Sequence, residues 1–314
     1  MESLLLAHRR AVVHQVWLQR TLGVLVKSGP FKYHRPESVG DTSKLLGEFG
    51  DNAKILAGGQ SLVPMMAMRL VQTDNVIDIN DVAEIQGVER LDDVLRIGAG
   101  TRQAAVEHDA VAGAAIPLLA QALPLIGHFQ IRNRGTIGGS IAHADPASEL
   151  PAVAVALDAQ LQITARTGSR TVAAADFFEG LWTTALSPDE ILTHVDFPIW
   201  GDRAGFALEE AARRSGDFAL VGAVVAVGLD GGDAVERAAI SLFGLGTTPI
   251  SATAAELALV GTSVDDIDFA DVASAALDGV DVREDVHASS RYRRKVATAL
   301  VMKALTRALE DARG

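Results

Sequence analysis

The sequence predicts an α+β protein in which an α/β part is followed by a C-terminal part built on long antiparallel strands. A strand, a double glycine and a helical stretch follow one another over residues 53–79, which is the order of a βαβ unit. Two long apolar runs flank Asp230-Gly231-Gly232, and this pattern favours a hairpin with a two-residue turn. Helical spacing then recurs at residues 254–260, 269–277 and 290–312.

Composition limits the class of protein. The chain has 314 residues, which is enough for two or three compact units, and its net charge of −12 argues against a nucleic-acid partner. The chain contains no cysteine, so it holds neither a disulfide nor a cysteine-bound zinc ion or iron–sulfur cluster of its own. This absence fits a cytoplasmic protein. No apolar run is long enough to span a bilayer, and we expect no membrane span.

The chain divides into three parts. Residues 1–29 are helical in pattern and are interpreted as an N-terminal extension, because the apolar run is too broken for a secretory signal. A first domain is expected over residues 30–205, with subdomains over about 30–86 and 87–205. A C-terminal domain follows over residues 206–314, after the boundary near Trp200-Gly201-Asp202.

Local signals place the elements of the first domain. Gly50 ends a helix, Thr101 is a candidate N-cap, and Pro198 stops a strand. We expect helices at residues 39–49, 62–70, 101–111, 117–126 and 151–157, and strands at residues 53–56, 76–79, 94–100, 160–165, 170–172 and 190–197.

The segment between the fourth and fifth of these helices, residues 130–149, is the least regular part of the chain. Three glycines weaken both helix and strand, and Pro146 cannot continue a ladder. Glycine also lets a backbone approach a ligand, and successive free N–H groups in a turn favour anions. We therefore interpret this segment as a loop around a ligand that carries phosphate.

A second glycine segment, residues 57–61, resembles part of this loop. Each segment has two glycines followed by a hydroxyl residue, so together they suit two linked phosphates. Neither is a Rossmann fingerprint or a P-loop, and a purely structural turn explains Gly58-Gly59 equally well. The candidate ligand-binding residues are Ala57, Gly58, Gly59, Gln60 and Ser61 in one segment and Thr136, Ile137, Gly138, Gly139 and Ser140 in the other.

Three ordered motifs give the chain a family resemblance from about Phe31 to its C-terminus. They are Ala57-Gly58-Gly59-Gln60-Ser61-Leu62, residues 130–140 with Ala144-Asp145-Pro146, and Arg213-Arg214-Ser215-Gly216-Asp217-Phe218. The chain resembles the FAD-binding medium subunits of molybdenum hydroxylases, the carbon monoxide dehydrogenase and xanthine dehydrogenase group. The resemblance implies two α/β subdomains that clasp FAD in the PCMH/VAO-type fold. It also implies a C-terminal domain with a small antiparallel sheet and a helix bundle.

The resemblance also implies roles for single residues. Both glycine segments would bind the FAD pyrophosphate and its surroundings, and Glu149 matches a family acid that bonds FAD hydroxyls. Phe218 falls where an aromatic ring, often tyrosine, covers the isoalloxazine, and phenylalanine keeps the ring without the hydroxyl. Asp145 is assigned to the ligand, although it could equally stabilise the turn before Pro146. No catalytic or metal-binding residue is expected on this chain.

By the same resemblance, the 2Fe–2S clusters and the molybdopterin cofactor lie on partner chains. The expected assembly joins this chain to a small iron–sulfur subunit and a large molybdenum subunit, as a dimer of heterotrimers. FAD would pass electrons from the clusters to an external acceptor. The alternatives are a self-sufficient flavin reductase or oxidase on the same fold and a nucleotide-binding regulator. The residues do not distinguish carbon monoxide, a purine or another N-heteroaromatic compound as the reducing substrate.

Several basic residues have simpler interpretations. His143 can hold its loop in place as readily as act as a base, and electron transfer needs no base. Arg132 and Arg134 are expected to be solvated loop cations by default. The cluster from Arg291 to Lys295 is interpreted as a solvated helix face, since cations early in a helix oppose its dipole.

Overall fold

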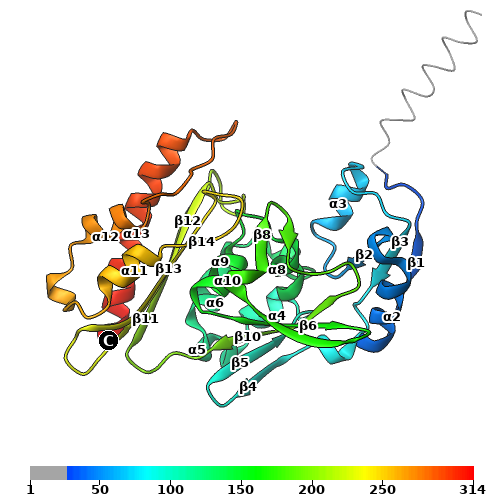
Figure 1. Ribbon diagram of the computed structural model, residues 1–314, viewed down its shortest axis with the longest axis horizontal. Helices are drawn as coiled ribbons and strands as arrows, with labels where there is room; N and C mark the ends of the chain where they lie inside the picture. The colour runs from blue at the N-terminus through cyan, green and yellow to red at the C-terminus, as the bar shows by residue number, and fades with distance from the viewer. Residues whose placement is uncertain (1–26) are drawn as a thin grey trace, which may run out of the picture.

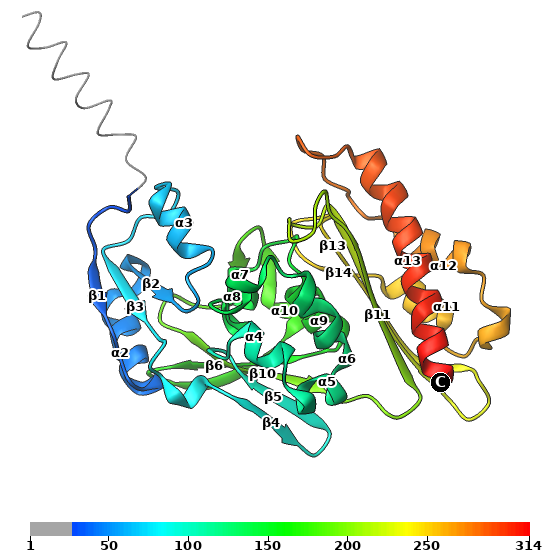
Figure 2. The same cartoon turned by 180° about the vertical axis from the view of Figure 1, so that it is seen from behind.

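The computed structural model describes residues 27–314, so nearly all of the predicted N-terminal extension lies outside the described residues. Three sheets follow one another along the long axis of the molecule, with the N-terminal sheet at one end and the C-terminal helices at the other (Figures 1 and 2). This mixed architecture confirms the predicted α+β class. No helix within residues 27–314 combines the length and the apolar character that a membrane span requires.

The N-terminal sheet is parallel and contains the predicted βαβ unit. Its strands are in the order β1-β3-β2, and β2 and β3 pair in parallel across the connection that contains α3. The helix before β2 is capped by the Ser38 side chain and ends at Gly50, as predicted. The elements are β1 (Lys32–His34), α2 (Val39–Phe49), β2 (Ala53–Leu56), α3 (Leu62–Ala67) and β3 (Asn75–Asp78).

The central sheet is antiparallel throughout, in the order β4-β5-β10-β6-β7. Its strands are β4 (Val88–Leu91), β5 (Val94–Gly98), β6 (Gln160–Ala165), β7 (Gly168–Ala173) and β10 (Ile191–Pro198), and a small hairpin joins β8 (Phe178–Gly180) to β9 (Thr183–Thr184). Its helices are α4 (Gln103–Glu107), α5 (Ala110–Ala115), α6 (Pro117–Ala122), α7 (Phe129–Arg132), α8 (Ile137–His143), α9 (Glu149–Ala156) and α10 (Ala174–Phe177). Every residue of α9 is buried, so this helix lies at the centre of the molecule.

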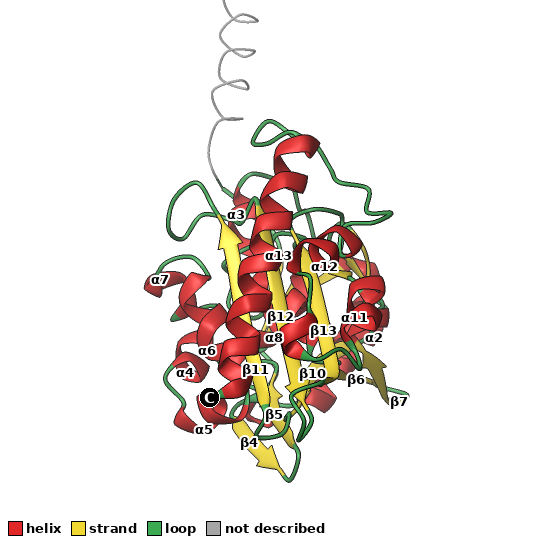
Figure 3. Cartoon of the chain, turned by 90° about the vertical axis from the view of Figure 1, so that its left-hand side faces the viewer, coloured by secondary structure: helices red, strands yellow, loops and turns green. Residues whose placement is uncertain are grey.

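The C-terminal sheet has two covered faces. Its strands are β11 (Ala204–Ala211), β12 (Val221–Leu229), β13 (Val235–Phe243) and β14 (Ile250–Ser251), all antiparallel. The helices α11 (Thr253–Leu259), α12 (Phe269–Ala275) and α13 (Ser290–Arg313) lie over one face (Figure 3). The other face packs on the central unit, because Phe206 and Leu208 of β11 share a hydrophobic core with α9.

Short 3₁₀ turns lie at Gly50–Asn52, Ala83–Ile85, Leu123–Leu125 and Val264–Asp266. The turn at Leu123–Leu125 continues α6, so the helix predicted over residues 117–126 ends in a tighter turn.

Two local predictions were wrong. Thr101 does not cap a helix: its hydroxyl exchanges hydrogen bonds with the backbone of Gly87, and the predicted helix is divided into α4 and α5, the second capped by Asp109. The β12–β13 connection is a five-residue loop rather than a two-residue turn. The Asp230 side chain accepts hydrogen bonds from the amides of Gly232 and Ala234 at 2.8 and 2.9 Å, and these bonds close the longer loop.

The basic cluster at the start of α13 is a solvated face in part: Arg291, Arg294 and Lys295 are exposed, as expected, whereas Arg293 is not. Arg293 is fully buried, and its guanidinium donates to Asp285 at 2.7 Å, to the Gly244 carbonyl at 2.9 Å and to the Leu220 carbonyl. Arg294 donates to the carbonyls of Leu277 and Val280. These bonds tie α13 to the end of the sheet and to the segment before the helix.

We expect Arg293→Met to destabilise the protein by about 3 kcal/mol, because it leaves buried carbonyl groups and Asp285 without their donor. Urea unfolding followed by circular dichroism measures the change. Arg291→Met, at an exposed position on the same helix, is the matched control and should change stability by less than about 0.5 kcal/mol. Equal stabilities of the two variants would contradict this role for Arg293.

Candidate functional site

A cleft of about 720 Å³ lies where the N-terminal sheet meets the central unit, and its volume is in the range of small-molecule sites. Both glycine segments line it, together with Glu149 and Phe218. Of the residues predicted to bind a ligand, Ile137 and Asp145 do not line the cleft. Ile137 is fully buried in the core. The Asp145 carboxylate accepts a hydrogen bond from Trp182, which does line the cleft.

The first glycine segment follows β2 and leads into α3. A Cβ atom on Gly58 would lie 2.4 Å from the Arg134 carbonyl oxygen and 2.7 Å from the Gly135 Cα atom, so only glycine lets the two segments touch. Gly59 adopts a φ of +72°, a backbone conformation that glycine reaches without strain. The structure therefore brings together two segments that are about 75 residues apart in the sequence.

The amides of this segment form a run of free donors beside the cleft. Among the residues that the structure describes, the N–H groups of Gly58, Gly59, Gln60 and Ser61 have no hydrogen-bond acceptor. Buried or half-buried N–H groups are nearly always paired, by protein, water or a ligand. A run of unpaired N–H groups beside a cleft fits a bound anion such as a pyrophosphate.

The second glycine segment is not the loop that the sequence predicts. It forms the first turn of α8, and the Thr136 hydroxyl caps that turn by accepting from the Gly139 amide at 3.0 Å. The Ile137 and Gly138 amides donate to Thr101 and Ala99 carbonyls at 3.0 and 2.8 Å. Because these amides are already hydrogen-bonded within the protein, the second segment does not offer an anion the run of free donors that the first segment offers. The second contributes close packing and, at Ser140, a hydroxyl that lines the cleft.

A clamp that the sequence did not reveal joins the two segments. The Arg102 guanidinium donates to the Asn80 side chain and to the Arg134 carbonyl, and Asn80 in turn donates to the Ala57 carbonyl at 3.0 Å. Burial lowers the pKa of Arg102. These partners are 22 and 32 residues from Arg102 in the chain, so no local pattern could have predicted the clamp.

Two exposed aromatic side chains line the cleft, Phe218 and Trp182. Trp182 lies at the tip of the β8–β9 hairpin with a φ of +53°, which is unusual for a bulky residue. Its indole N–H donates to the Asp145 carboxylate at 3.3 Å, and its ring lies nearly parallel to that of His143 with centroids 6.3 Å apart. His143 and Asp145 thus hold an aromatic side chain, and burial lowers the pKa of His143.

Arg132, near the cleft, is not the solvated loop cation that the sequence predicts. This side chain is nearly buried and forms a two-point ion pair with Glu107, with distances of 2.6 and 3.0 Å. It also donates to the Ile126 and Gly127 carbonyls, and so stabilises the turn before α7 instead of being a solvated cation. Glu149 is buried, and desolvation raises its pKa to about 8.

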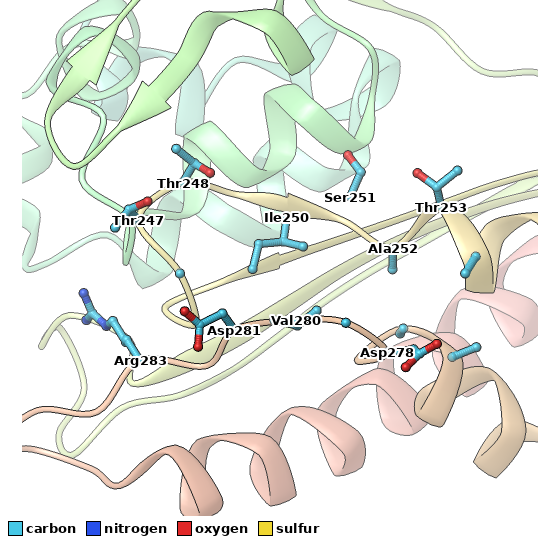
Figure 4. Close-up of a pocket in the computed structure, with 15 residues that line it drawn as sticks. Thr247, Thr248, Ile250, Ser251, Ala252, Thr253, Asp278, Val280, Asp281 and Arg283 are labelled. Carbon is cyan, nitrogen blue, oxygen red and sulfur yellow. The ribbon is translucent and has the colours of Figure 1, made fainter.

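A second hollow, of about 580 Å³, lies in the C-terminal domain between β14 and the segment that joins α12 to α13 (Figure 4). Hydroxyl residues and the side chains of Asp278, Asp281 and Arg283 line it. It contains none of the predicted site residues. The larger cleft is therefore the candidate functional site.

Comparison with known proteins supports this choice. Residues 29–200 match the FAD binding domain in molybdopterin dehydrogenase, and residues 206–308 match the CO dehydrogenase flavoprotein C-terminal domain. Caffeine dehydrogenase subunit beta of Pseudomonas sp. strain CBB1 is 38% identical over 91% of this chain and 97% of its own length. The carbon monoxide dehydrogenase medium chain of Hydrogenophaga pseudoflava is 35% identical over 88% of this chain and 96% of its own length.

Solved structures agree with this relationship. Carbon monoxide dehydrogenase from Hydrogenophaga pseudoflava, in a form that lacks the Mo-pyranopterin moiety, aligns with a TM-score of 0.88 and 37% identity over 90% of this chain and 99% of that chain. Quinoline 2-oxidoreductase from Pseudomonas putida 86 aligns with a TM-score of 0.86 and 33% identity over 91% of this chain and 99% of that chain.

Proposed function

We propose a function from one premise, that the chain belongs to the family of FAD-binding medium subunits of molybdenum-containing dehydrogenases. The chain binds FAD in the cleft, receives electrons from iron–sulfur clusters on a partner chain and passes them to an external acceptor. The observation that carries the cofactor assignment is the run of unpaired amides at Gly58 to Ser61 beside the cleft. Bound flavin supplies the ability to accept electrons singly and release them in pairs.

The residues of this chain hold and shield the cofactor. The amides of residues 58–61 bind the pyrophosphate, and the hydroxyls of Ser61 and Ser140 add hydrogen bonds. Glu149 bonds cofactor hydroxyls from the buried wall of the cleft. Phe218 and Trp182 cover the flavin and keep water from it, because both side chains line the cleft. No residue of this chain acts on the substrate.

The proposed assembly includes partner chains, because this chain lacks the cysteines that an iron–sulfur cluster requires. Without cysteine it cannot ligate an iron–sulfur cluster by itself, so the clusters belong to a small partner subunit and the molybdenum cofactor to a large one. We propose a dimer of such heterotrimers, located in the cytoplasm. Within this chain, residues 30–205 form the FAD-binding domain, with subdomains that divide near residue 86, and residues 206–314 form the C-terminal domain.

Purification of the tagged chain together with its co-expressed neighbours tests this function. We expect a yellow complex with one FAD per copy of this chain, and with iron and molybdenum on the other chains. Reducing substrate should bleach the flavin only in the complete complex. Substrate turnover by the isolated chain, without iron or molybdenum, would instead support a self-sufficient flavoenzyme, and a colourless complex that takes up no FAD would contradict both functions.

Tryptophan fluorescence offers a second readout. We expect FAD to quench the emission of Trp182, which lines the cleft, while Trp200 packs under the guanidinium of Arg237 at 4.0 Å, away from the cleft lining. In a Trp17→Phe background, which leaves Trp182 and Trp200 as the two tryptophans of the chain, Trp182→Phe should therefore remove most of the quenching while it keeps an aromatic ring at the cleft. Trp200→Phe is the matched control. Equal quenching in the wild-type protein and in Trp182→Phe would show that Trp182 does not contact the flavin.

A further inference from the structure

The second hollow, of about 580 Å³, is separate from the cleft that is proposed to hold FAD, because the two share no lining residue. One wall is the loop between β13 and β14 with the residues after it, and the other is the segment between α12 and α13 (Figure 4). The walls meet where the Arg283 amide donates to the Leu245 carbonyl at 2.8 Å. This bond places Arg283 beside residues 246–248, which also line the hollow.

The loop wall carries a run of free amides. Within the part of the chain that the structure describes, the N–H groups of Gly246, Thr247 and Thr248 have no hydrogen-bond acceptor. Gly246 and Thr248 are half-buried, and polar groups at such positions are usually paired with protein, water or a ligand. The side chains of the two threonines add hydroxyl groups to the same wall. Successive free N–H groups in a loop favour an anion.

The opposite wall supplies a cation whose hydrogen-bonding capacity is largely unused. Arg283 is half-buried, and its Nε atom is buried without a hydrogen-bond partner among the described residues. Its guanidinium has one ion-pair contact, to the Asp285 carboxylate at 3.6 Å, and that carboxylate accepts a much closer hydrogen bond from Arg293 at 2.7 Å. A buried donor without an acceptor is costly, and an anion in the hollow would supply the acceptor.

Two carboxylates, of Asp278 and Asp281, also line the hollow. Both residues are exposed, so water and salt screen their repulsion of an anion, whereas the Arg283 Nε atom is shielded from water. Figure 4 shows Asp278 at the end of the hollow away from Arg283. At that end, carboxylate and hydroxyl groups can bond the hydroxyl groups of a polar ligand.

We propose that this hollow is a second ligand site, which binds a phosphate group either as free phosphate or as part of a small phosphate ester. The amides of residues 246–248 and the Arg283 guanidinium hold the phosphate oxygens from the two walls. A tetrahedral phosphate can accept hydrogen bonds from both walls at once, whereas the oxygens of a carboxylate lie in one plane. The volume of the hollow is in the range of small-molecule sites, so it has room for the organic part of an ester.

Titration of the FAD-loaded complex with inorganic phosphate, followed by the phosphorus NMR line width of the free anion, tests the inference. Bound FAD occupies the amides of residues 58–61, so these do not compete for the probe. We expect saturable binding of one phosphate per copy of this chain, and no competition from acetate at equal ionic strength. Glycerol phosphate, added as a competitor, distinguishes the two sources: tighter binding than that of inorganic phosphate indicates an ester, and binding no tighter indicates free phosphate.

Variants of the charged residues should change phosphate affinity in opposite directions. Arg283→Met removes the guanidinium and should weaken phosphate binding by at least about tenfold, and Arg283→Lys, which keeps the charge without the fork of N–H groups, should be intermediate. Asp281→Asn removes a repelling charge and should strengthen binding by up to about fivefold. Arg291→Met, at an exposed position outside the hollow, is the matched control and should bind phosphate as the wild-type protein does. Thermal unfolding checks each fold, and Asp281→Asn keeps the test decisive if Arg283→Met does not fold.

Several results would overturn the inference while leaving the proposed function in place. They are the absence of saturable phosphate binding, equal competition by acetate, unchanged affinity in a folded Arg283→Met variant, and weaker binding by Asp281→Asn. Failure of the proposed function has a different signature: the complex would take up no FAD, and phosphate binding that depends on Arg283 would persist.

Discussion

Replacing Gly58 by valine is expected to abolish FAD retention. The new Cβ atom would lie 2.4 Å from the Arg134 carbonyl oxygen, and both the oxygen and the nearby Gly135 Cα atom belong to the backbone and cannot rotate away. The first glycine segment must then move away from the second, and its free amides move with it. The FAD content of the purified complex, measured by absorbance after release of the flavin, should fall by at least about tenfold, which corresponds to 1.4 kcal/mol of lost binding.

Gly201→Val is the control for this variant. A Cβ atom on Gly201 would meet nothing within 4 Å, and this residue does not line the cleft. Its flavin content should match that of the wild-type protein. Normal flavin content in Gly58→Val would mean that contact between the two glycine segments is not needed to hold the cofactor.

Replacing Arg102 by methionine is expected to weaken FAD binding by about tenfold or more. The variant loses the donors to Asn80 and to the Arg134 carbonyl, and hydrogen bonds to charged groups contribute about 1.5–3 kcal/mol. Because Asn80 also holds the Ala57 carbonyl, the first glycine segment loses its attachment to the second. The measurement is the FAD dissociation constant of the flavin-free complex.

Two further variants show whether geometry or charge matters at this position. Arg102→Lys keeps the charge but not the fork of N–H groups, so it should bind FAD with intermediate affinity. Arg90→Met, which removes an exposed arginine, should bind FAD as the wild-type protein does. If Arg102→Met retained wild-type affinity, the clamp would be only a structural contact.

The sequence predicts the elements whose signals are local. The βαβ unit of the N-terminal sheet, the helix that ends at Gly50 and the long apolar strands of the C-terminal sheet all appear where periodicity and turn residues place them. A helix was also expected over residues 151–157, and the structure forms α9 there and buries it completely.

Predictions failed where side chains compete for backbone groups. Residues 130–149 were expected to be one loop, yet capping by Thr136 and donation from the Ile137 and Gly138 amides to nearby carbonyls produce a helix there. Asp230 similarly holds a longer loop in place of a two-residue turn. Such bonds depend on which groups the fold brings together, and composition alone does not reveal them.

The candidate site was only partly predictable. Glycine pairs followed by hydroxyl residues identify the two segments, and family resemblance adds Glu149 and Phe218. Arg102 and Trp182 were missed, since each is significant only through a partner far away in the sequence. Arg293, in the basic cluster at the start of α13, was misinterpreted for the same reason. Burial of Arg293 against Gly244 and Leu220 becomes visible only in the folded chain.

The central claim is that the first glycine segment holds the FAD pyrophosphate at the cleft. A crystal structure or a cryo-EM reconstruction of the FAD-loaded complex tests it most directly. We expect phosphate oxygens within about 3 Å of the amide nitrogens of residues 58–61, with the flavin ring beside Phe218 and Trp182. A pyrophosphate bound elsewhere, with those amides paired to water or to protein, would contradict the account.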